Sequence, residues 1–190
     1  MSIEGPVFDQ IGSEFRADLH RVFKAVLQGL KEDGCQEYYY FTDADDVDPF
    51  YEDNVDLTGA FMKFDDEPWK LEGFSDAVIG KEAVADIINK FVIPESKLAT
   101  IDYDNACEVA FMVNYKKLER ARVRGVGTQL ALAKRSHLRY DLGMRTMIAT
   151  VEPSNIKSIR ILKKIGLELA SEKTIESKPG FLRDCYIGNI

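Results

Sequence analysis

A short glycine-containing stretch, Arg122-Val-Arg-Gly-Val-Gly-Thr128, leads directly into an apolar helical pattern at residues 129–135. The first N–H groups of a helix have no partner inside the helix, and the helix dipole places partial positive charge at the same end. Gly125 and Gly127 have no Cβ, so the backbone there can approach a bound group closely. The stretch predicts a binding site for phosphate-like anions, although glycines also serve as ordinary turn and capping residues.

Two apolar segments lie on either side of this loop and its helix. Residues 106–113 (Ala-Cys-Glu-Val-Ala-Phe-Met-Val) predict a buried strand that contains one carboxylate, and residues 145–151 predict a second strand. The second strand is followed by Glu-Pro-Ser-Asn and then by a helix that ends near Gly166. The predicted order is strand, anion-binding loop, helix, strand, and a helix that begins at an asparagine.

This order of segments resembles the GNAT superfamily of acyl-CoA N-acyltransferases. The superfamily loop pattern, Arg/Gln-x-x-Gly-x-Gly/Ala, is matched by Arg122, Gly125 and Gly127. Its later pattern, Asn-x-x-Ser/Ala followed by a hydrophobic helix and a Gly-hydrophobic pair, is matched by Asn155, Ser158, Gly166 and Leu167. The segment at 108–113 is similar to the corresponding strand of bacterial protein-lysine acetyltransferases.

The resemblance implies an α/β fold with a central mixed, mostly antiparallel β-sheet flanked by α-helices. It also implies a cofactor-binding core at about residues 106–167 and acetyl-CoA as the acyl donor. The length of the chain, with no internal repeat or linker, predicts one domain over residues 1–190. Backbone groups of the first strand are expected to pair with the pantetheine arm, and the glycine loop is expected to hold the diphosphate. The expected cofactor-binding residues are Phe111, Val113, Arg122, Val123, Arg124, Gly125, Val126, Gly127, Thr128, Asn155 and Ser158.

Glu108 is the candidate catalytic residue. Strand alternation places Glu108, Ala110 and Met112 on one side and Cys107 with Val109 on the other. A carboxylate among apolar residues is costly unless it is paired or functional, and desolvation raises its pKa toward the range of a general base. An amine is mostly protonated at neutral pH and attacks an acyl group only in its neutral form, so it needs a base. The alternative is an edge-strand glutamate that faces water; the resemblance favours the base.

Two departures from the superfamily pattern bear on activity. The segment between Val113 and Arg122 is longer than the pattern usually has, so residues 114–121 predict an extended loop. Many members have a tyrosine on the helix after the asparagine, where it protonates the leaving thiolate, and Leu162 stands at that position. The general acid is therefore unassigned. These departures keep open an alternative, a non-catalytic acyl-CoA-binding or regulatory module.

The remaining segments add expected elements around this core. Apolar residues at helical spacing predict a helix over 11–31 and a shorter one over 81–91, while residues 57–80 contain too many glycines and prolines for an assignment. The expected strands are 38–42, 168–174 and 181–187, the last two joined by a turn through 177–180.

Residues 43–56 are strongly acidic. A calcium-binding loop counted from Asp43 would need an oxygen ligand, a glycine and a glutamate where the chain has Val47, Asp48 and Asn54, which excludes that reading. The stretch is either a solvated loop or a rim that attracts a basic peptide or amine.

The net charge, the apolar runs and the cysteines of the chain limit its classes of binding partner and its location. The net charge of −7 argues against nucleic acid, and no apolar run is long enough for a membrane span or signal peptide. Cys35, Cys107 and Cys185 lack metal-type spacing, so we expect free thiols, a cytoplasmic location and no metal cofactor.

The expected function is transfer of an acetyl group from acetyl-CoA to a primary amine, directly within a ternary complex. The acceptor is either a protein lysine or a small-molecule amine. The acyl chain length and the oligomeric state, a homodimer included, are left open by the sequence.

Overall fold

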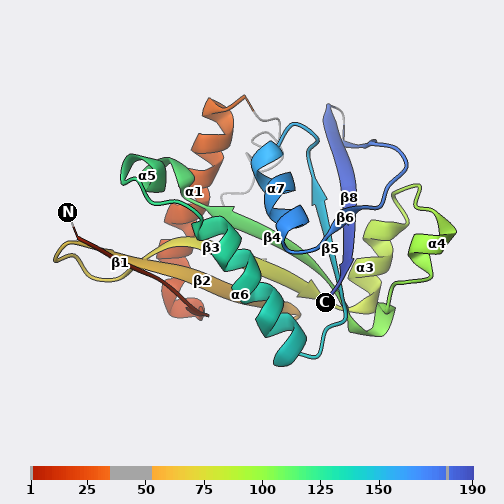
Figure 1. Cartoon of the computed structure of the whole chain (residues 1–190), viewed down its shortest axis with the longest axis horizontal. Helices are drawn as coiled ribbons and strands as arrows, with labels where there is room; N and C mark the ends of the chain where they lie inside the picture. The colour runs from red at the N-terminus through yellow and green to blue at the C-terminus, as the bar shows by residue number, and fades with distance from the viewer. Residues whose placement is uncertain (1, 35–52, 179) are drawn as a thin grey trace.

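The computed structural model describes residues 2–34, 53–178 and 180–190 (Figure 1). Eight strands are hydrogen-bonded in the order β1-β2-β3-β4-β5-β8-β6, and β7 pairs with β8. Their bounds are β1 Ile3–Gln10, β2 Val55–Phe64, β3 Lys70–Ile79, β4 Ala106–Val113, β5 Thr146–Val151, β6 Glu168–Leu169, β7 Ile175–Lys178 and β8 Phe181–Asn189.

The helices are distributed over both faces of this sheet. Their bounds are α1 Arg16–Glu32, α3 Lys81–Ile88, α4 Glu95–Leu98, α5 Tyr115–Arg120, α6 Val126–Tyr140 and α7 Ile156–Lys164. Apolar clusters join α1 and α3 to one face, and another cluster joins α6 and α7 to the opposite face (Figure 1). The predicted mixed, mostly antiparallel sheet flanked by helices is confirmed.

Only β4 and β5 run parallel; every other strand pair among the described residues is antiparallel. Parallel neighbours need a long crossover, which α5 and α6 supply here. The alternation predicted for β4 is confirmed, because Met112 packs in the cluster with α1 while Cys107 and Val109 pack in the cluster with α6 and α7.

Several predicted elements differ from the structure. The helix predicted over 11–31 begins at Arg16, and residues 3–10 before it form an edge strand that the sequence did not indicate. The unassigned stretch 57–80 contains most of β2 and β3, and the helix predicted over 81–91 ends at Ile88. The strand predicted over 168–174 is reduced to the two residues of β6, and β7 follows at 175–178.

The extended loop predicted over 114–121 is wrong, because this segment forms the helix α5. The Asn114 side chain caps α5 by accepting a hydrogen bond from the backbone N–H of Lys117 at 3.4 Å. The extra length relative to the superfamily pattern is therefore ordered structure.

Two expectations fall wholly or partly outside the described residues: the strand at 38–42, and residues 43–52 of the acidic stretch at 43–56. Of the rest of that stretch, Asp56 lies on β2 and forms an ion pair with the buried ammonium of Lys134. Asp56 is thus a structural residue rather than part of a substrate-attracting rim. In the ranges that the structure covers, no helix is long and apolar enough to cross a membrane.

Candidate active site

The parallel strands β4 and β5 separate partway along their length. They pair from Ala106–Thr146 to Glu108–Ile148 and no further. Beyond this point β4 stays paired with β3 as far as Val113, and β5 stays paired with β8 as far as Val151. The edge of β4 over residues 109–113 consequently faces β5 without ladder hydrogen bonds. Backbone N–H and C=O groups on such an edge can pair with a bound ligand.

A cavity of about 620 Å³ occupies the space between the separated strands. It reaches both faces of the sheet, since Val26 and Leu30 of α1 line it from one side and Gly127 and Ile161 line it from the other. Its walls include residues 109–113 and 149–151, and its polar lining residues include Thr128, Ser154, Asn155 and Ser158. A cavity open to both faces can receive two substrates that approach from opposite sides.

The glycine loop forms a second hollow of about 710 Å³ at the start of α6. Gly125 has φ 82° directly before the helix, a left-handed conformation that glycine adopts readily, and a Cβ at this position would have no neighbour within 4 Å. The hollow is lined by the predicted phosphate-binding residues Arg122, Val123, Arg124, Gly125, Val126 and Gly127. The two hollows share Val113, Tyr115, Gly125 and Gly127, so one extended ligand can occupy both.

Gly127 has a packing role in addition. A Cβ on Gly127 would lie 3.0 Å from Ile161 Cδ1 and 3.6 Å from Val113 Cγ2. The absence of a side chain at Gly127 therefore lets the first turn of α6 approach both α7 and the end of β4.

Asn155 and Ser158 lie together at the start of α7. The Asn155 Oδ1 atom accepts a hydrogen bond from the backbone N–H of Ser158 at 3.1 Å, which makes Asn155 the N-cap of this helix. Leu162, at the position of the superfamily tyrosine, is buried and lines the cavity. No phenol stands at that position to protonate a thiolate.

Glu108 lies at the point where the strands separate. It is not a lining residue of the cavity, whereas Ala110, the next residue on the same face of β4, is. Burial, and after it the negative charge of Asp76, raise the pKa of Glu108 to about 7 against the opposing effect of Lys90 and Arg183. A carboxyl group that titrates near neutral pH can accept a proton from an amine.

Asp76 on β3 is a carboxylate that the sequence analysis did not single out. It pairs in register with Ala110, so it lies on the same face as Glu108. Burial raises the pKa of Asp76 to about 6. The signal in the sequence was a carboxylate inside an apolar stretch, but the glycines around it prevented a strand assignment.

A second group of residues missed by the sequence analysis borders the cavity. The Tyr115 hydroxyl lies 2.6 Å from Asp33 Oδ2 and 2.9 Å from Gly29 O, and Lys157 Nζ lies 3.1 Å from the same Asp33 oxygen. Lys116 and Tyr115 hold the pKa of Asp33 well below its usual range. Burial raises the pKa of Tyr115, and the Asp33 carboxylate raises it in the same direction, so this phenol is a weak acid. The group links α1, α5 and α7 beside the cavity.

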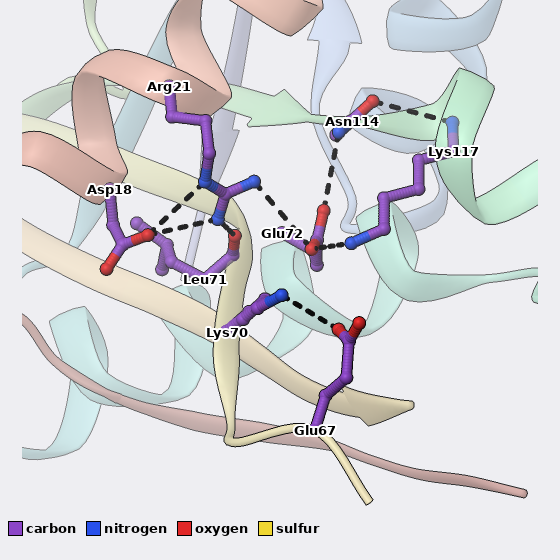
Figure 2. A network of polar contacts seen from close by, with 8 residues as sticks. All are labelled: Asp18, Arg21, Glu67, Lys70, Leu71, Glu72, Asn114 and Lys117. Atoms are coloured by element: carbon purple, nitrogen blue, oxygen red, sulfur yellow. Dashed lines mark hydrogen bonds and ion pairs between the residues drawn. The ribbon is translucent and has the colours of Figure 1, made fainter. Parts of the chain in front are cut away.

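A buried carboxylate holds α5 in place (Figure 2). The Glu72 side chain has no exposed surface; it forms an ion pair with Lys117 and accepts a hydrogen bond from the Asn114 amide at 3.3 Å. Arg21 of α1 approaches Glu72 Oε1 to 3.8 Å and donates to Leu71 O (Figure 2). The segment before the glycine loop is therefore anchored to β3 and α1 instead of bulging outward.

Other reactive groups do not converge on the cavity. Cys107 and Cys185 are buried free thiols, and burial raises the pKa of each to about 12. Cys35 is outside the described residues. Within the part of the chain that the structure describes, no three His, Cys, Asp or Glu side chains are grouped as metal ligands.

Comparison with known proteins gives matches at the level of structure. No protein-family profile matches the sequence, and no curated protein matches it. The GNAT domain of S. lividans PAT is similar over 96% of this chain and 89% of its own, with a TM-score of 0.56 and 18% identity. An N-acetyltransferase from Staphylococcus aureus Mu50 is similar over 98% of each chain, with a TM-score of 0.58 and 14% identity.

Another similar structure is the aminoglycoside acetyltransferase AAC(6')-Ib, in complex with coenzyme A and kanamycin. It covers 99% of this chain and 95% of its own, with a TM-score of 0.57 and 15% identity. Each of these likenesses extends over at least 96% of this chain. The chain therefore has the fold of the GNAT superfamily of acyl-CoA N-acyltransferases.

Proposed function

We propose that this protein is an N-acetyltransferase that moves an acetyl group from acetyl-CoA to a primary amine within a ternary complex. The observation that carries the proposal is the continuity of two features. The open edge of β4 borders a cavity, and that cavity joins the hollow at the glycine loop through Val113, Tyr115, Gly125 and Gly127. Acetyltransferases of the same fold, one of them in complex with coenzyme A, add to this support.

The proposed binding mode assigns each end of acetyl-CoA to one hollow. The diphosphate accepts hydrogen bonds from the backbone N–H groups of residues 122–128, with positive charge from Arg122 and Arg124. The pantetheine arm pairs with the backbone of β4 near Phe111 and Val113. Thr128, Asn155 and Ser158 contact the arm from the starts of α6 and α7, where they line the cavity.

In the proposed reaction the amine nitrogen attacks the thioester carbonyl carbon, and the C–S bond breaks as the C–N bond forms. Glu108 accepts the proton that the amine loses, either directly or through a water molecule. Backbone N–H groups on the open edge of β4 stabilise the negative charge that develops on the carbonyl oxygen. The donor of the proton to the departing thiolate is not assigned, because Leu162 replaces the superfamily tyrosine.

The acceptor is a primary amine, either a protein lysine or a small molecule. AAC(6')-Ib is in complex with kanamycin, but it is only 15% identical to this chain, so this likeness favours neither acceptor class. A cytoplasmic location is part of the proposal, supported by the free thiols Cys107 and Cys185. Homodimerisation stays a prediction that light scattering can check.

Initial-rate kinetics of thiol release from acetyl-CoA with a panel of primary amines test this function. Direct transfer predicts intersecting double-reciprocal lines, since both substrates must bind before either product leaves. Glu108→Gln is expected to lower kcat at least a hundredfold while acetyl-CoA still binds. The matched control is Glu82→Gln, an exposed glutamate on α3, which should retain full activity.

A second candidate function is a non-catalytic acyl-CoA-binding module. It is favoured by Leu162 in place of the tyrosine and by the position of Glu108 outside the cavity lining. This candidate predicts that acetyl-CoA binds but that no amine in the panel accelerates thiol release.

A further inference from the structure

Asp76 and Glu108 occupy diagonal positions on neighbouring antiparallel strands. Asp76 is in register with Ala110, and Val78 is in register with Glu108, so the two carboxylates are one ladder step apart on one face of the sheet. Such diagonal neighbours are about 7–8 Å apart at the backbone, and the charge of Asp76 acts on Glu108. The β-sheet register thus brings together two carboxylates that are separated by thirty-two positions in the sequence (108 − 76 = 32).

The two carboxylates lie beside the cavity, and few partners offset the cost of burying their charges. Asp76 Oδ1 is buried and has no hydrogen-bond partner among the described residues. Neither carboxylate forms an ion pair within that part of the chain. Ala110, which pairs with Asp76 and lies two residues after Glu108 on β4, lines the cavity. A buried carboxylate oxygen without a hydrogen-bond partner is costly to a fold, which points to a function for Asp76.

The charged groups that act on the pair come from three other elements. Lys90 after α3 and Arg183 of β8 favour the ionised form of Glu108, and Lys134 of α6 favours the ionised form of Asp76. These influences are smaller than the effect of burial on either carboxylate. The Cys185 thiol nearby is neutral, because burial and Glu108 both raise its pKa. Burial therefore raises the pKa of both carboxylates toward neutral pH.

Asp33 also lines the cavity, but its carboxylate is not suited to accept a proton. It is paired with Lys116 at 2.7 Å and with Lys157 at 3.1 Å, and these partners hold its pKa low. A carboxylate of such low basicity accepts protons poorly.

We propose that Asp76 is a positioning residue of this enzyme, whose negative charge beside Glu108 enables Glu108 to accept a proton from an acceptor that arrives as an alkylammonium ion. The proposal rests on the proposed function and narrows its substrate class to aliphatic amines. The alkylammonium ion is attracted by the carboxylate pair and transfers one proton to Glu108. It then attacks the thioester carbon as the neutral amine. The C–S bond breaks as the C–N bond forms, and the second proton that the nitrogen loses balances the charge of the departing thiolate. Aromatic amines, which are uncharged at neutral pH, gain no such attraction.

The test is the pH dependence of kcat/KM for an aliphatic diamine in wild-type protein and in Asp76→Asn. The asparagine keeps the side-chain shape but removes the charge, so the acidic limb should move to lower pH by about one unit. In ¹³C-carboxyl-labelled protein without substrate, the NMR titration midpoint of Glu108 should move in the same direction; Glu108→Gln identifies that signal. Asp66→Asn, in the exposed turn between β2 and β3, is the matched control and should move neither value.

Each outcome decides the inference. Parallel shifts in the kinetic limb and the NMR midpoint support it. The inference is overturned if the wild type turns over the diamine but the acidic limb of kcat/KM is unchanged in Asp76→Asn. It is also overturned if the NMR titration midpoint of Glu108 is unchanged in that variant. Absence of turnover in wild-type protein with every amine would contradict the proposed function itself, which separates the two failures. Acetyl-CoA binding by Asp76→Asn checks that the variant is folded, and Asp76→Glu, which restores the charge, should return the limb toward the wild-type position.

Discussion

The Lys117 ammonium forms an ion pair with the Glu72 carboxylate, whose side chain is completely buried (Figure 2). The pair joins α5 to the middle of the sheet immediately before the glycine loop. Lys117 also places its Nζ 4.6 Å from the centre of the Phe64 ring, so the ammonium contacts two strands. The position of the loop that is proposed to hold phosphate therefore depends on a charge pair outside the cavity.

Lys117→Met should lower the free energy of unfolding by about 1–3 kcal/mol, because Glu72 would lose its principal counter-charge inside the protein. The loss stays moderate since Arg21 remains 3.8 Å from Glu72 and Lys117 is itself 38% exposed. Urea denaturation measures it. The matched control is Lys70→Met, which removes the partner of exposed Glu67 and should change stability little. Equal effects of the two variants would contradict the role given to Glu72.

Gly125→Glu should weaken acetyl-CoA binding by at least tenfold, because it places a carboxylate in the hollow proposed for the diphosphate. Its control is Gly143→Glu, just beyond the other end of α6. Both glycines have positive φ, 82° and 70°, and a Cβ on either would have no neighbour within 4 Å. Both variants should therefore lose similar stability, about 1 kcal/mol. Titration calorimetry that found equally weakened binding in both would attribute the effect to backbone strain.

Stability should depend on pH through Glu108. Its folded-state pKa, about 7, lies above the ordinary value of 4.5, so the folded protein holds this proton more tightly than the unfolded chain. The ionised carboxylate therefore costs stability as pH rises from 4.5 to 7, and the cost is constant above that range. Glu108→Gln should gain stability relative to wild type between pH 5 and pH 8, by up to about 3 kcal/mol. A pH-independent difference in urea unfolding would contradict this.

Tyr115→Phe should leave kcat within about threefold of wild type, since the raised pKa of this phenol makes it a poor general acid. The variant should lose about 1 kcal/mol of stability, because it removes the hydroxyl contacts with Gly29 and Asp33. A fall in kcat of a hundredfold or more, measured with acetyl-CoA and a reactive amine, would instead assign Tyr115 as the missing proton donor.

The elements that are proposed to hold the cofactor were predictable from local sequence. The bounds of β4 agree with the predicted strand, and the glycine loop and the Asn155 cap lie where the pattern indicated. These features depend on short-range properties, namely alternation, helix capping and glycine conformation. The positive φ of Gly125 is a local requirement of the turn into α6.

Strands β2 and β3 were missed because their glycines serve long-range packing. A Cβ on Gly59 would lie 2.7 Å from Ile11, Leu71 and Phe61 side-chain atoms, and one on Gly73 would lie 3.0 Å from the backbone oxygen of Met112. Glycine in these strands is required by close neighbours that local sequence does not reveal. The position of Asp76 was hidden for the same reason, since only the register between β3 and β4 places it on the same face as Glu108 and diagonal to it.

Titration calorimetry with acetyl-CoA tests the central claim most directly, with desulfo-CoA and ATP as comparison ligands. We predict saturable binding of acetyl-CoA and desulfo-CoA with one site per chain, no comparable binding of ATP, and loss of affinity in Gly125→Glu but not in Gly143→Glu. Absence of binding by both CoA species would contradict the claim that the separated strands and the glycine loop form an acyl-CoA site. The proposed acetyl transfer would then be rejected as well.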